Sequence, residues 1–102
     1  MKYQLVLQLP ASSLADYDEM IKLEEVIIRG LGKLGKVDGH DAGSGETNVF
    51  VLTDYPQLAF EQIKSTLGTR DCMPSLKVAY RELGTDNFTI LYPSGLTNFE
   101  IA

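Results

Sequence analysis

The fold is decided by residues 36–53, which read KVDGHDAGSGETNVFVLT. We expect strands over residues 36–41 and 47–53, joined by the glycine-containing loop 42–46, which is suited to a hairpin. Residues 49–52, Val-Phe-Val-Leu, are apolar on both faces of the second strand. Such a strand is typical of the middle of a sheet that is covered on both sides. We therefore expect helices on one face of this sheet and another element, such as a second subunit, on the other.

Upstream of the hairpin, the pattern predicts a strand followed by a long helix. Apolar residues alternate over residues 3–9 and Pro10 ends the alternation, as expected of a strand with one buried face. Ser13 precedes Asp16 by three residues, which resembles a capping box, and an amphipathic segment runs from there to about Leu31. The segment is expected to form a helix with one buried side.

Downstream of the hairpin, we expect a second helix, two further strands and a last apolar segment. Asp54 is placed to cap a helix that ends at Gly68. Strands are expected over residues 77–83 and 88–92, on either side of a turn. Apolar residues recur in 94–102, which is expected to add a short edge strand or to pack on a neighbouring chain.

The resulting order is β-α-β-β-α-β with an additional C-terminal strand. It resembles the ferredoxin-like superfold, an α+β two-layer sandwich in which two helices cover one face of a four-stranded antiparallel sheet. The chain has 102 residues and fits a single domain, residues 1–102, because chains of this length rarely divide. Folds of this kind host many unrelated functions, so the function has to be argued from individual residues.

Charge and cysteine content exclude several classes of function. Fourteen acidic against nine basic residues give a net charge of −5, and the basic residues are scattered, so we expect no nucleic-acid partner. No apolar run approaches the length of a membrane span, and no membrane association is expected. The single cysteine, Cys72, cannot form an internal disulfide, which favours a soluble protein of the cytoplasm. The acidic residues and the histidine lack the spacing of a metal site, so neither a metal nor another cofactor is expected.

Residues 39–47 form a glycine-dense polar segment with several chemically able side chains. Successive glycines can point backbone N–H groups into one concavity and so bind an anion, with hydroxyl groups as further donors. The candidate ligand-binding residues are Gly43, Ser44, Gly45 and Thr47. His40, the only histidine, is a candidate for general acid–base catalysis, with Asp41 beside it. The other interpretation is a tight hairpin loop with solvated acids, because turn residues are selected for backbone reasons.

Glu24 is the third candidate catalytic residue, because it falls inside the apolar side of the first predicted helix. A buried carboxylate without a partner is strongly unfavourable. We therefore expect Glu24 to contact a partner, for which Arg81 or a tyrosine hydroxyl is suited, or to lie in solvent. A structural contact is one interpretation, and a catalytic carboxylate in a cleft is the other.

Two classes of function remain. The first is a non-enzymatic protein-interaction or regulatory domain, which associates as a homodimer or with another protein through the sheet face that the helices leave bare. Val6 and the apolar residues of 94–102 are expected to supply that face. The alternative is a small enzyme or ligand-binding protein with a shallow site near residues 39–47. We favour the first class, because enzymes bring several convergent polar groups together and here only one loop does.

Overall fold

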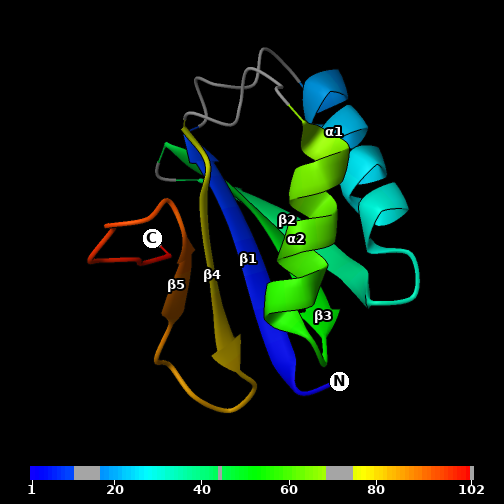
Figure 1. Cartoon of the computed structure of the whole chain (residues 1–102). Coiled ribbons are helices and arrows are strands. Elements are labelled where there is room, and N and C mark those ends of the chain that lie inside the picture. The colour runs from blue at the N-terminus through cyan, green and yellow to red at the C-terminus, as the bar shows by residue number, and fades with distance from the viewer. Residues whose placement is uncertain (11–16, 44, 69–74, 102) are drawn as a thin grey trace.

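The computed structural model describes residues 1–10, 17–43, 45–68 and 75–101 (Figure 1). The elements are β1 Tyr3–Pro10, α1 Tyr17–Leu31, β2 Gly35–Gly43, β3 Glu46–Thr53, α2 Pro56–Leu67, β4 Lys77–Glu82 and β5 Thr89–Tyr92. The predicted hairpin is confirmed as β2 and β3, and the two predicted helices and the later strands are also present. The predicted capping box at residues 13–16 lies outside the described residues.

The five strands form one antiparallel sheet in the order β2-β3-β1-β4-β5. β3 lies between β2 and β1, which confirms the prediction from its two apolar faces that it is an inner strand. β1 is the middle strand, where Leu7 lies opposite Val49 of β3 on one side and Val78 of β4 on the other. The described residues therefore form an α+β fold that is compatible with a two-layer sandwich.

Both helices lie on one face of the sheet (Figure 1). Leu5, Leu7 and Leu9 alternate along β1, point to this face and are buried in the main core. The helical residues that meet them recur at helical spacing: Leu23, Val26, Ile27 and Leu31 on α1, and Ala59, Phe60, Ile63 and Leu67 on α2. Burial of this apolar surface is the dominant stabilising contribution to the fold. Neither of the two described helices has the length and apolar character needed to cross a membrane.

The two helices approach each other closely at Gly30. A Cβ atom at this position would lie 2.8 Å from Oγ1 of Thr66 and 3.2 Å from Cα of Ile63. Both distances are shorter than ordinary van der Waals contact, and the second one involves backbone. The absence of a side chain at Gly30 therefore allows α1 and α2 to pack at this separation.

The face of the sheet opposite the helices, called the helix-free face below, is covered in part by the chain's own residues 93–101. Phe99 is buried together with Val6 of β1 and Ala79 of β4. Its ring centroid lies 5.0 Å from that of Phe88, in the tilted geometry that aromatic pairs favour. These residues form a second, smaller apolar cluster on the helix-free face.

A partly buried hydrogen bond from Gln8 holds this C-terminal segment, residues 93–101, against the sheet. The Gln8 side chain donates from Nε2 to the backbone oxygen of Glu100 at 2.8 Å and to Oδ1 of Asn48 at 3.0 Å. The expectation that Val6 stays bare for a partner chain is therefore wrong, because the segment folds back on its own sheet. The described part of the segment also forms no strand of its own.

Candidate functional site

Two of the three candidate catalytic residues come together on the helix side of the sheet. Oε1 of Glu24, on α1, forms an ion pair with Nδ1 of His40, on the edge strand β2. The contact is an ion pair when the imidazole is protonated. The Glu24 side chain is 16% exposed and that of His40 is 30% exposed. Because Oε1 of Glu24 itself is shielded from solvent, the imidazole supplies the contact that a partly buried carboxylate needs.

A β-bulge in β2 directs His40 towards the helix. The register with β3 shifts between Val37 and Gly39, so Asp38 is an extra residue in β2. In a regular strand, residues three apart face opposite sides of the sheet. The extra residue instead places Val37 and His40 on the same side, beneath α1. Gly39 has a φ angle of 123°, a conformation that glycine adopts readily and other residues avoid.

Arg81, one of the partners expected for Glu24, is engaged elsewhere. Its Nε donates to Oε1 of Gln4 at 2.9 Å and its Nη1 donates to the backbone oxygen of Thr85 at 2.8 Å. Gln4 and Arg81 lie directly opposite each other in the β1–β4 register, on the helix-free face. Glu24 thus has a partner, as expected, but the partner is His40.

Asp41 does not join the Glu24–His40 pair. Asp41 directly follows His40 in β2 and lies opposite Asn48 of β3. Because successive residues of a strand face opposite sides, Asp41 belongs to the helix-free face. Asp41 is also exposed, which is consistent with a solvated acid. The structure therefore separates the two neighbouring candidates, His40 and Asp41, onto opposite sides of the sheet.

The candidate ligand-binding residues do not form a common concavity among the described residues. Thr47 is buried opposite Leu9, so its hydroxyl group is not presented to solvent. Gly43 ends β2, and Gly45 is exposed with a φ angle of 79°, as a tight hairpin turn requires. Ser44 lies outside the described residues. For the residues that are described, the hairpin-turn interpretation of this loop accounts for the geometry.

The Glu24–His40 pair has the chemistry of a base with an orienting carboxylate. A carboxylate at Nδ1 fixes the ring and favours the tautomer whose Nε2 can accept a proton. A hollow of about 250 Å³ lies on the same border between α1 and β2, and its lining includes Ile28, Leu31 and Val37. Neither Glu24 nor His40 belongs to that lining. The arrangement therefore accounts for a contact that holds α1 against the edge strand.

A cluster of tyrosines that the sequence analysis missed lies where β1 begins and where β3 and β4 end. Tyr3, Tyr55 and Tyr80 line a shallow hollow of about 290 Å³ together with Asp54 and Leu58, called the tyrosine hollow below. The rings of Tyr3 and Tyr80 meet edge to face, with centroids 5.7 Å apart and an interplanar angle of 84°. The alternation of β1 and β4 could have placed these two rings on one face. Tyr55 could not have been placed, because its position depends on where α2 begins.

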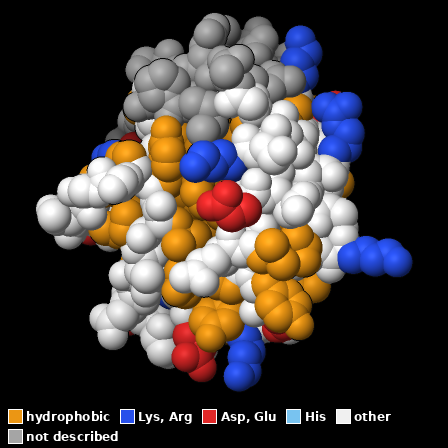
Figure 2. Space-filling view, in the orientation of Figure 1, with side chains coloured by type: hydrophobic (Ala, Val, Ile, Leu, Met, Phe, Trp, Pro, Cys, Tyr) orange, Lys and Arg blue, Asp and Glu red, His pale blue; other side chains and the backbone are white. Residues whose placement is uncertain are grey.

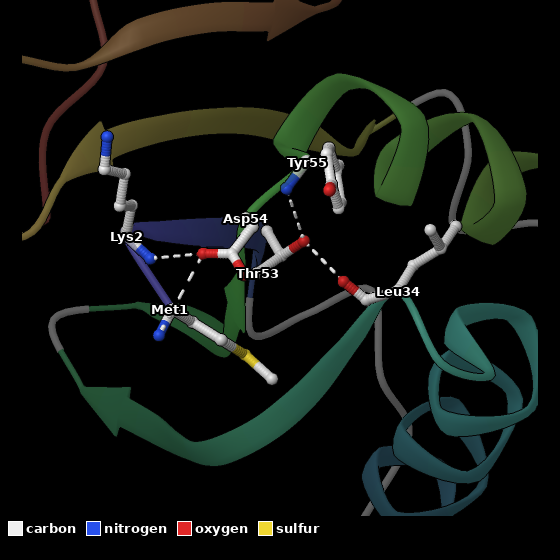
Figure 3. A network of polar contacts seen from close by, with 6 residues as sticks. All are labelled: Met1, Lys2, Leu34, Thr53, Asp54 and Tyr55. Atoms are coloured by element: carbon white, nitrogen blue, oxygen red, sulfur yellow. Dashed lines mark hydrogen bonds and ion pairs between the residues drawn. The ribbon is translucent and has the colours of Figure 1, made fainter.

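Hydrogen bonds fix the backbone that presents Tyr55 (Figure 3). Oγ1 of Thr53 donates to the backbone oxygen of Leu34 at 2.6 Å and accepts from the backbone N–H of Tyr55 at 3.0 Å. Oδ1 of Asp54 accepts from the backbone N–H of Lys2 at 2.9 Å. The predicted capping role of Asp54 is therefore wrong, because Tyr55 occupies the N-cap position and Asp54 ties the end of β3 to the start of β1.

Comparison of the chain with models of known protein families, with curated proteins and with solved structures found no match.

Proposed function

We propose that the chain is a ferredoxin-like protein-interaction domain that forms a homodimer through its helix-free face. The element order from β1 to β4, with one helix after β1 and another after β3, supports the ferredoxin-like assignment. β5 extends the sheet at the β4 edge, as an addition to that pattern does. A cytoplasmic location is part of the proposal, because a single cysteine favours a reducing compartment.

The observation that carries the proposal is a rim of half-buried apolar side chains on the helix-free face. Val6 and its neighbours are sealed beneath the C-terminal segment, but the rim around them is still partly accessible. The rim consists of Phe50, Phe88, Ile90 and Ile101, which pack against the smaller apolar cluster. A second copy placed on this face would bury the rest of their apolar surface, at a gain of roughly 25 cal/mol per Å².

The edges of the sheet favour face-to-face association over strand addition. β2, at one edge, carries the bulge at Asp38 and has exposed charged residues at Lys36 and Asp41. β5, at the other edge, has four residues and is followed by Pro93. Bulges, charges, prolines and short edge strands all discourage pairing with another strand. The helix-free face is therefore the surface on which we expect the second copy.

The dimer is tested by measuring mass with light scattering over a range of protein concentrations. Phe50→Glu places a charge on the rim, so we expect it to convert the dimer into a folded monomer. Ile28→Glu is the matched control, because Ile28 is 53% exposed on α1, on the other side of the sheet. Circular dichroism checks that both variants fold. A wild-type chain that stays monomeric at high micromolar concentration would contradict the proposal, as would a dimer that Phe50→Glu leaves intact.

The Glu24–His40 pair favours a second candidate, a small enzyme or ligand-binding protein in which His40 is the base and Glu24 orients it. Native mass spectrometry of the purified protein tests this candidate. A small molecule carried by the wild-type chain and by Lys36→Ala, but lost from His40→Ala, would support it. Purified chains that carry nothing, with His40→Ala lowering only the stability, would argue against it.

A further inference from the structure

We propose that the tyrosine hollow binds an extended, proline-containing peptide segment that carries a basic residue. The proposal concerns the helix side of the sheet, because Tyr3 and Tyr80 share a face with Leu5 of β1, which packs under the helices. It therefore goes beyond the homodimer, whose surface lies on the helix-free face.

Exposed apolar side chains are concentrated at the end of the molecule where this hollow lies, and Tyr55 and Leu58 line it. Among the side chains whose exposure the structure describes, five large apolar ones are exposed, and four of them, Met1, Tyr55, Leu58 and Leu83, lie at this end of the molecule. Tyr55 is 61% exposed and Leu58 is 50% exposed. Leu83 is tied to the same end, because its backbone N–H donates to the backbone oxygen of Lys2 at 2.8 Å. Figure 2 shows apolar side chains gathered over the lower end of α2 and the strand ends beside it. Apolar surface concentrated in this way marks an interaction site.

The size and lining of the hollow fit part of an extended chain. At about 290 Å³ it falls at the lower limit for pockets that enclose a small molecule, so it accommodates a few side chains of a segment that lies across it. Tyrosine offers an apolar ring and a hydroxyl group that can donate. A polyproline II segment has flat apolar rings and backbone carbonyls without internal hydrogen bonds. Grooves lined by aromatic side chains recognise such segments through this complementarity.

Acidic groups beside the tyrosines select the charge of the partner. Asp54 lines the hollow with 53% of its side chain exposed, and its Oδ1 also forms an ion pair with the N-terminal ammonium group of Met1 at 4.0 Å. Glu82 is exposed and lies directly opposite Tyr3 in the β1–β4 register, hence on the same face. The chain as a whole carries a net charge of −5. A lysine or arginine in the peptide is therefore electrostatically complementary to this end of the molecule.

The binding test uses a short polyproline peptide that contains one arginine, titrated into the isotope-labelled protein and followed by amide chemical shifts. We expect saturable shifts at Tyr3, Tyr55 and Tyr80. Tyr55→Ala is expected to weaken binding by about tenfold or more, as loss of an aromatic anchor does. Ile28→Ala, at an exposed apolar position on α1, is the matched control and is expected to bind like the wild-type chain.

The charge preference is tested with Glu82→Gln. This variant is expected to weaken binding of the arginine-containing peptide and to leave binding of an all-proline peptide unchanged. The proposal is overturned if neither peptide shifts the tyrosine amides at millimolar concentration, or if Tyr55→Ala binds as well as the wild-type chain. Amide shifts at Tyr55 that grow with protein concentration in the absence of peptide would show that a second copy of the chain occupies the hollow. That result would also overturn the proposal. The homodimer is tested by the mass of the Phe50→Glu variant, and peptide binding is tested with Tyr55→Ala. Failure of one proposal can therefore be distinguished from failure of the other.

Discussion

At the level of single residues, the contact between Glu24 and His40 explains why an acid is tolerated on the apolar side of α1. The Glu24 oxygen is shielded from solvent, and Nδ1 of the His40 imidazole, on the neighbouring strand, forms an ion pair with it. When one member of such a pair is removed, the other is left partly desolvated and without its contact. This lowers the free energy of unfolding by more than the contact itself contributes. The pair therefore constrains which substitutions the α1–β2 border accepts.

We expect His40→Ala to lower the free energy of unfolding by about 1–2 kcal/mol, because the carboxylate of Glu24 then loses its imidazole contact. Urea denaturation followed by circular dichroism measures the change. Glu24→Gln in the His40→Ala background is expected to recover part of the loss, because a neutral amide is less costly to bury than a carboxylate. Equal stability of His40→Ala and the wild-type chain would contradict a structural role for the pair.

The partner of Glu24 could not be predicted because of one residue in β2. The helical wheel showed correctly that Glu24 falls among buried positions of α1. Counting in twos along residues 36–41, however, places His40 on the face opposite Val37, which is the wrong side. The bulge at Asp38 changes this parity, and bulges have no reliable sequence signal beyond a glycine such as Gly39. The sequence pattern therefore does not indicate that the two candidates meet, although they are in contact in the structure.

At the level of secondary-structure elements, the separation of α1 and α2 depends on Gly30. Helix axes usually pack 8–10 Å apart, depending on the side chains at the contact. At Gly30 the contact is made by Thr66 and the backbone of Ile63 on α2. A glycine inside a helix lowers its intrinsic stability by about 1 kcal/mol relative to alanine. Close packing of the two helices is the compensating contribution.

Gly30→Ala is expected to destabilise the protein by about 1–2 kcal/mol, because the strain of the added methyl group exceeds the gain in helix propensity. Thermal and urea denaturation measure this change. Thr66→Ala removes the nearest atom and is expected to restore part of the stability when combined with Gly30→Ala. If Gly30→Ala raised the stability, the helices would have room for a side chain and the close contact would not be limiting.

At the level of the whole molecule, the two faces of the sheet are covered by different means. Two helices shield the larger core, and the C-terminal segment shields the smaller cluster around Val6 and Phe99. The segment covers the middle of the helix-free face, and the apolar rim around that middle is left half-buried. The segment is thus both part of the fold and part of the surface on which the proposed dimer forms.

Phe99→Ala is expected to lower the free energy of unfolding by about 2–4 kcal/mol, because it leaves a cavity over Val6 and Ala79. It is also expected to increase binding of a hydrophobic dye, since apolar surface on the helix-free face becomes accessible. Urea denaturation and dye fluorescence measure the two effects. Phe88→Ala, at a half-buried position of the same cluster, is the comparison variant and is expected to cost less. A loss for Phe99→Ala within experimental error would show that the segment does not depend on this ring.

The sequence predicted the elements well and their long-range contacts poorly. Alternation over residues 3–9 and the two apolar faces of 49–52 were sufficient for the strands, because these patterns reflect local geometry. The packing of Phe99 on its own sheet was not predictable, because an apolar residue in this segment can be buried equally well against its own sheet or against a neighbouring chain. The tyrosine hollow required three distant segments to meet. Local periodicity carries no information about such a meeting.

The hydrogen bond between Gln8 and Glu100 joins residues that are 92 positions apart. At translation rates of about 5–20 residues per second, β1 is synthesised roughly 5–20 seconds before the residues that shield Val6. During this interval Val6 is not yet covered by the C-terminal segment. Exposed apolar residues of this kind are what holding chaperones bind. Residues 99–101 cover Val6 only after they too have left the ribosome, so loss of chaperone affinity is expected to follow their emergence.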